Sequence, residues 1–120
     1  MQKILLIAIG GASGSVLRYL TSLFVGTFFS GKFPLATFII NFLGCFLIGL
    51  FFQFSGKFDE KIKYLLMIGF CGGFTTFSTF ANENLQLIQA GNYLTALAYM
   101  LLSVVTGVVA VWLGMVLLKF

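Results

Sequence analysis

Four long apolar runs, separated by short polar segments, restrict this chain more than any other feature of its sequence. Each run is long enough for the roughly 20 residues that a helix needs to cross a bilayer. The sequence therefore predicts one all-α transmembrane domain over residues 1–120, with both termini on the same side of the membrane. Its helices are expected at residues 3–29, 34–54, 61–90 and 93–119.

Charged residues are few, and they lie mostly at the ends of these runs. Only 8% of the residues are charged, histidine is absent, and the three acids and two cysteines form neither a nucleophile–base pair nor a metal-binding spacing. Scattered basic residues at helix ends are typical of topology signals and interfacial anchors. We therefore expect a lipid bilayer as the partner, no nucleic acid, no required protein partner other than a second copy, and no enzymatic activity.

The third run contains an uncharged segment, Gly69–Phe80, with three glycines, four phenylalanines and four hydroxyl residues. Glycines weaken a helix, and irregular backbone at mid-membrane persists only where it is packed in protein or lines a wet cavity. We expect the helix to stop near Gly72 and Gly73 and to restart near Phe77, which places a break near residues 72–76. Unpaired carbonyls at such a break can coordinate sodium.

The same segment carries groups that suit an anion. Phe77 and Phe80 are three residues apart, hence on one helix face, and the edge of an aromatic ring is positive. The neighbouring hydroxyls could donate hydrogen bonds to an ion in place of water. Each feature also has a structural explanation, because phenylalanine faces lipid in many spans and hydroxyls often bond to a carbonyl one turn earlier.

Polar residues in the first two runs also allow two interpretations. Arg18 either extends to the interface or lines a wet vestibule, where its charge would attract anions. Thr37 and Asn41 are four residues apart and share a helix face. The amide of Asn41 either links two helices or donates hydrogen bonds to a passing anion.

Three segments of the chain resemble the signature of the CrcB/Fluc family of bacterial fluoride channels. They are Gly69–Phe80, GGASGSVLRY at residues 10–19 and NFLGCFLIG at residues 41–49. The resemblance covers the whole chain and implies a fluoride-selective channel for passive export across the bacterial inner membrane. It also implies an antiparallel, dual-topology homodimer with a broken third helix in each subunit and two narrow pores.

The resemblance assigns roles to individual residues. Phe77 and Phe80 match pore phenylalanines whose ring edges face fluoride, and Asn41 matches a pore asparagine. The carbonyls of Gly72 and Thr75 are implied to hold a structural sodium ion where the two breaks cross at the dimer centre. The other candidate residues are Thr37, Ser78, Thr79, Glu83, Tyr99 and Ser103 in the pore, and Arg18 in the vestibule.

The distribution of positive charge fits dual insertion less well. Five basic residues lie on the side of the termini and two on the other side. The former are Lys3, Lys57, Lys61, Lys63 and Lys119, and the latter are Lys32 and Arg18. This bias favours termini in the cytoplasm.

Two other functions fit a chain of this size. A small multidrug-type cation/proton antiporter needs a titratable carboxylate deep in the membrane, for which Glu83 is the only candidate within a span. A non-conducting scaffold subunit is the other possibility.

Overall fold

The computed structural model describes residues 1–57, 59–117 and 119, and this part of the chain is helical and contains no strand. Helices α3, η1 and α4 follow one another directly and, with α5, form the third span, Glu60–Gln89. The elements are α1 (Gln2–Gly26), α2 (Leu35–Gln53), α3 (Glu60–Lys63), the π-helix η1 (Tyr64–Cys71), α4 (Gly72–Phe74), α5 (Ser78–Gln89) and α6 (Tyr93–Leu117).

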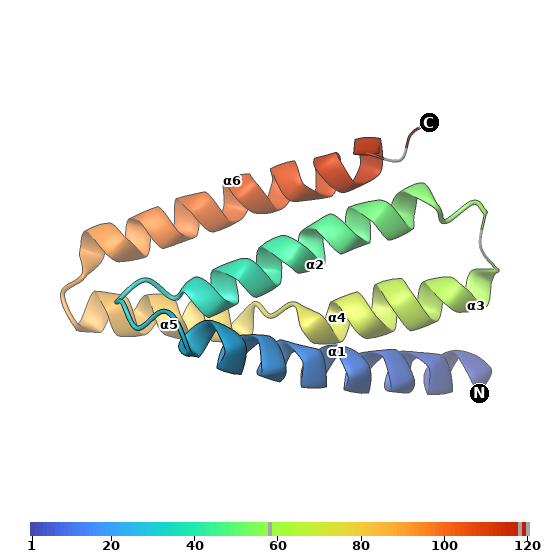
Figure 1. Ribbon diagram of the computed structural model, residues 1–120, viewed down its shortest axis with the longest axis horizontal. Helices are drawn as coiled ribbons and strands as arrows, with labels where there is room; N and C mark the ends of the chain where they lie inside the picture. Colours follow the sequence, from blue (N-terminus) through green and yellow to red (C-terminus); the bar gives the residue numbers. More distant parts are fainter. Residues whose placement is uncertain (58, 118, 120) are drawn as a thin grey trace.

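The spans run alternately in opposite directions, and both termini lie at the same end of the molecule (Figure 1). Four of the described segments are long and apolar enough to cross a membrane. The prediction of an all-α protein with four membrane-spanning helices is therefore confirmed. The expected first helix was too long, because residues 27–29 are an apolar turn that hydrophobicity alone does not distinguish from helix. The expected end of the last helix at residue 119 includes Leu118, which lies outside the described residues.

Helix α1 packs closely against η1 and α4, at contacts that leave no room for a side chain (Figure 1). A Cβ atom at Gly10 would collide with the carbonyl oxygen of Leu65, and one at Gly14 with that of Phe70. Small residues spaced four apart allow such close approach in membranes. Gly10 and Gly14 have this spacing, so the sequence pattern accounts for the close contact.

Helices α2 and α6 form a second close pair (Figure 1). A Cβ atom at Gly49 would collide with the carbonyl oxygen of Val111, and one at Gly114 with that of Phe46. Ala110, one turn before Gly114, is fully buried. Ala110 and Gly114 therefore serve the packing of α6 against α2.

The break in the third span begins at Thr75, within the expected residues 72–76, and α5 begins directly after Phe77, near which the restart was expected. Both glycines are helical, and Thr75 is the first extended residue, with φ −78° and ψ 158°. Gly73 is needed for packing instead, because a Cβ atom there would lie 2.5 Å from the carbonyl oxygen of Gly11. Gly44 on α2 makes space for the break, since its Cβ would collide with Cγ2 of Thr75.

Replacing Gly14 with alanine tests the close packing of α1. We expect Gly14→Ala to lower the free energy of unfolding by about 1–3 kcal/mol, because the backbone of Phe70 and Phe74 cannot yield to the added methyl group. Gly26→Ala is the matched control on the same helix, because nothing lies within 4 Å of its Cβ position. Thermal unfolding in detergent measures both, and equal stability of the two variants would contradict the packing.

Candidate functional site

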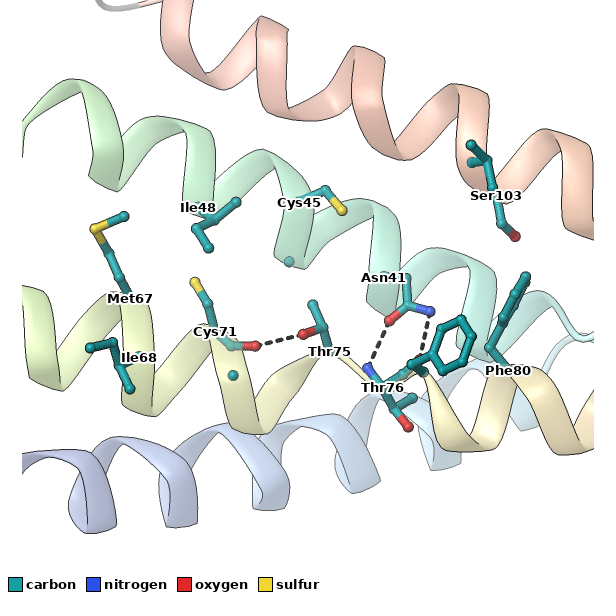
Figure 2. Close-up of a pocket in the computed structure, with 14 residues that line it drawn as sticks. Asn41, Cys45, Ile48, Met67, Ile68, Cys71, Thr75, Thr76, Phe80 and Ser103 are labelled. Atoms are coloured by element: carbon teal, nitrogen blue, oxygen red, sulfur yellow. Dashed lines mark hydrogen bonds between the residues drawn. The ribbon is translucent and has the colours of Figure 1, made fainter. Parts of the chain in front are cut away.

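The break is fixed to α2 by the side chain of Asn41. Its Nδ2 donates to the carbonyl oxygen of Thr76 at 3.0 Å, and its Oδ1 accepts from the N–H of Thr76 at 2.9 Å (Figure 2). Both backbone polar groups of a residue outside the helices are thereby paired, as the membrane interior requires. The interpretation of Asn41 as an interhelical link is confirmed. One amide N–H remains for another acceptor, and its contact with an anion stays a prediction.

The four hydroxyl residues around the break differ in their hydrogen bonds. Thr75 Oγ1 donates to the carbonyl oxygen of Cys71 at 2.8 Å, which is bonding to the preceding turn. Thr76 Oγ1 accepts from the N–H of Thr79 at 3.3 Å, which pairs a backbone donor in the first turn of α5. Within the described residues, the side-chain hydroxyls of Ser78 and Thr79 make no hydrogen bond. These two hydroxyls are therefore free to donate to a bound ion or to water.

A cleft of about 490 Å³, which we call the central cleft, opens beside the break between α2, η1, α4 and α6 (Figure 2). Phe77 and Phe80 both line it, with ring centroids 5.8 Å apart, so the expectation that they share a face is confirmed. Phe77 is 78% exposed, although it sits on the third span. Ser103 lines the cleft from α6, and its hydroxyl is buried without a hydrogen-bond partner among the described residues. Apolar groups and unpaired donors thus meet in one cleft.

The remaining lining of the central cleft is mostly apolar. None of the described residues that line it is charged. Besides Phe77, Phe80 and Ser103, they are Asn41, Gly44, Cys45, Ile48, Met67, Ile68, Cys71, Gly72, Thr75, Thr76 and Val104.

Glu83 on α5 is held by two hydroxyl groups from other helices. Thr37 donates to its Oε2 at 2.9 Å, and Tyr99 donates to its Oε1 at 2.8 Å. Tyr99 is fully buried, and its ring centroid lies 4.9 Å from that of Phe80. Glu83 also lines a second cleft of about 380 Å³ near the α1–α2 loop, together with Lys32. The network therefore connects the ring of Phe80 with a polar opening.

Arg18 lies in a third cleft, of about 240 Å³, between α1, α2 and the start of α5, which we call the Arg18 cleft. Arg18 is half-buried and has no ion-pair partner among the described residues. The structure therefore places Arg18 at a cleft, and its role in a wet vestibule stays a prediction. The described residues that line it are Ser15, Arg18, Tyr19, Ser22, Thr37, Ile40, Thr76 and Thr79.

Two residues connect these clefts. Thr76 lines both the central cleft and the Arg18 cleft, and Thr37 lines the Arg18 cleft while it donates to Glu83. Sequence reasoning missed Ser15 and Ser22 of the Arg18 cleft. Their spacing in the sequence could have identified them, because Ser15 precedes Arg18 by three residues and Ser22 follows it by four, so both share its helix face.

Possible metal ligands are confined to the backbone in the described part of the chain, where no group of three His, Cys, Asp or Glu residues could hold a metal. Gly72 is exposed, and nothing lies within 4 Å of its Cβ position. In a continuous helix its carbonyl would accept from Thr76, whose N–H donates to Asn41 instead. The break thus removes the helical partner of the Gly72 carbonyl.

Comparison with known proteins gives matches over almost the whole chain. Residues 5–115 match the family described as "CrcB-like protein, Camphor Resistance (CrcB)". A protein named "Fluoride-specific ion channel FluC" from Azobacteroides pseudotrichonymphae is 48% identical, over 100% of this chain and 98% of its own length. Proteins of the same name from Flavobacterium psychrophilum and Chloroflexus aurantiacus are 48% and 44% identical, over 99% and 95% of this chain and 98% and 93% of their own lengths.

Removal of the Asn41 side chain tests how the break is held. We expect Asn41→Ala to cost about 1–3 kcal/mol of stability, because it leaves the N–H and carbonyl of Thr76 without partners. Amide hydrogen exchange at residues 75–77 should accelerate at the same time. Asn82→Ala, at an exposed position on α5, is the control, and equal exchange in both variants would show that Asn41 does not hold the break.

Proposed function

Because the chain belongs to the CrcB family, we propose that it forms a fluoride-selective channel that lets fluoride leave the cell passively across the inner membrane. The observation that carries this proposal is the central cleft beside the break, where Asn41, Ser103 and the rings of Phe77 and Phe80 meet without any charged residue among the described lining. Relatives that match along nearly their full length are named as fluoride channels.

The chemistry of this cleft suits a small, strongly hydrated anion. Such an ion sheds water only where donors and positive edges replace it. The central cleft offers the second amide N–H of Asn41 and the unpaired hydroxyl of Ser103. On the next turn, Ser78 and Thr79 supply hydroxyls, while Tyr99 and Thr37 lead to Glu83. We therefore assign these residues to the fluoride path, with Arg18 at its vestibule.

A second copy of the chain, in antiparallel orientation, completes the pores in this proposal. Phe77 is 78% exposed, so one subunit leaves this ring of the central cleft without a full surround. Two crossing copies would place two such clefts around a shared centre. An antiparallel homodimer requires both insertion orientations, whereas the excess of basic residues on the side of the termini favours one of them. The ratio of the two orientations in the membrane therefore tests this assembly.

The residues at the break fit a structural sodium ion at the centre of that dimer. The Gly72 carbonyl has lost its helical partner, and Thr75 has left the helix. Two crossing breaks would supply four such carbonyls from Gly72 and Thr75, the ligand type that holds sodium in broken-helix membrane proteins. The open space around Gly72 allows the close approach of a second backbone.

The structure and the relatives give no support to a small multidrug-type antiporter. Glu83 would have to exchange protons and bind a cationic substrate, but its two carboxylate oxygens already accept hydrogen bonds from Thr37 and Tyr99. A scaffold role differs from the channel in a simple way, because a scaffold would leave liposomes sealed to fluoride.

Replacing Phe80 with isoleucine tests the fluoride path. Liposomes that contain the wild-type protein should release fluoride and retain chloride. Phe80→Ile removes the ring beside Tyr99, and we expect it to slow fluoride release by about tenfold or more, a change of at least about 1.4 kcal/mol in the barrier. Phe24→Ile, at an exposed position on α1, is the control.

The assembly state of each variant must be measured by size exclusion. An intact dimer with fluoride release as fast as the wild type in Phe80→Ile would contradict the assignment of this ring to the path. If liposomes that contain the wild-type protein release no fluoride, the proposed channel function is contradicted.

A further inference from the structure

Hydroxyl side chains within the spans fall into two groups. Ser13, Thr21 and Thr106 each donate to the carbonyl oxygen four residues earlier, at 2.8, 2.8 and 2.5 Å. This bonding satisfies a hydroxyl that faces lipid or apolar side chains. Hydroxyls of the second group make no such bond within the described residues, although their helices offer the same carbonyls.

Ser15 and Ser22 belong to the second group and share helix α1 with Ser13 and Thr21. Both line the Arg18 cleft. Their spacing around Arg18, three residues before and four after, places all three side chains on one face of the helix. The hydroxyls of α1 therefore differ by their position relative to the Arg18 cleft: Ser13 and Thr21, which do not line it, bond to their own helix, and the two that line it keep a free donor.

The surroundings of these free donors favour an anion. Arg18 is the one charged side chain among the described residues that line the cleft, and no carboxylate lines it there. Thr79, from the start of α5, adds another hydroxyl without a partner, and the positive end of that helix dipole lies close by. Thr76 forms the boundary with the central cleft. An anion held here is thus positioned next to the break.

We propose that Ser15 and Ser22 bind fluoride beside Arg18 and replace part of its water before it enters the central cleft. This inference rests on the proposed channel function and extends it to a face of α1. Arg18 supplies the attraction at longer range, and the two serines supply hydrogen bonds at contact. Removal of water in stages lowers the barrier that a bare ion would meet at the rings.

The test compares hydroxyl removal inside and outside the Arg18 cleft on one helix. We expect Ser15→Ala and Ser22→Ala each to raise the half-saturating fluoride concentration for efflux by roughly three- to tenfold, because a hydrogen bond to a charged group is lost and water replaces part of it. Ser13→Ala and Thr21→Val, which remove hydroxyls bonded to their own helix, should leave this concentration unchanged. Ser15→Thr and Ser22→Thr keep a hydroxyl, so their half-saturating fluoride concentrations should equal that of the wild type.

The measurement is fluoride efflux from liposomes over a range of fluoride concentrations, together with thermal stability of each variant. Equal half-saturating concentrations in all four hydroxyl-removal variants would overturn this inference and leave the channel intact. The inference would also be overturned if the alanine variants lost fluoride efflux in proportion to their loss of thermal stability and the threonine variants at the same positions showed the same loss of efflux. Absence of fluoride efflux from the wild-type protein would overturn the channel function and this inference together.

Discussion

Two hydrogen bonds between Asn41 and the backbone of Thr76 are the interaction on which the broken third span depends. No water is available at mid-membrane to pair the N–H and carbonyl that a break exposes, so a side chain from another helix must do so. Gly44 complements this interaction, because its missing side chain lets Thr75 approach α2. The amide that stabilises the break also borders the central cleft, so one residue links the stability of the fold to the proposed ion path.

Polar side chains connect the break with the Arg18 cleft and with Glu83. Thr76 leads to the Arg18 cleft, which carries a positive charge, and Thr37 leads to Glu83, whose carboxyl oxygens accept hydrogen bonds from Thr37 and Tyr99. The central cleft between them has no charged lining among the described residues. An anion would therefore meet charge at the entrance and directional donors within, an arrangement that favours entry without trapping the ion.

Local patterns in the sequence predicted the spans and their close contacts, but not the contacts between distant residues. Run length and spacing are sufficient for the helices, for the shared face of Phe77 and Phe80, and for the approach at Gly10 and Gly14. The break begins at Thr75, within the range expected from the sequence, but Gly72 and Gly73 are still helical, and Gly73 packs against Gly11 instead of ending the helix. The π-helix η1 and the pairing of Asn41 with Thr76, 35 residues away, depend on tertiary packing that no local pattern encodes.

The central claim is that donors and ring edges around the break select fluoride from other anions. A planar bilayer that contains the purified protein, with opposed gradients of fluoride and chloride, tests it most directly. We expect a current that reverses at the equilibrium potential of fluoride and does not shift when the chloride gradient is changed. A reversal potential that follows chloride, or no current from the purified protein, would contradict it.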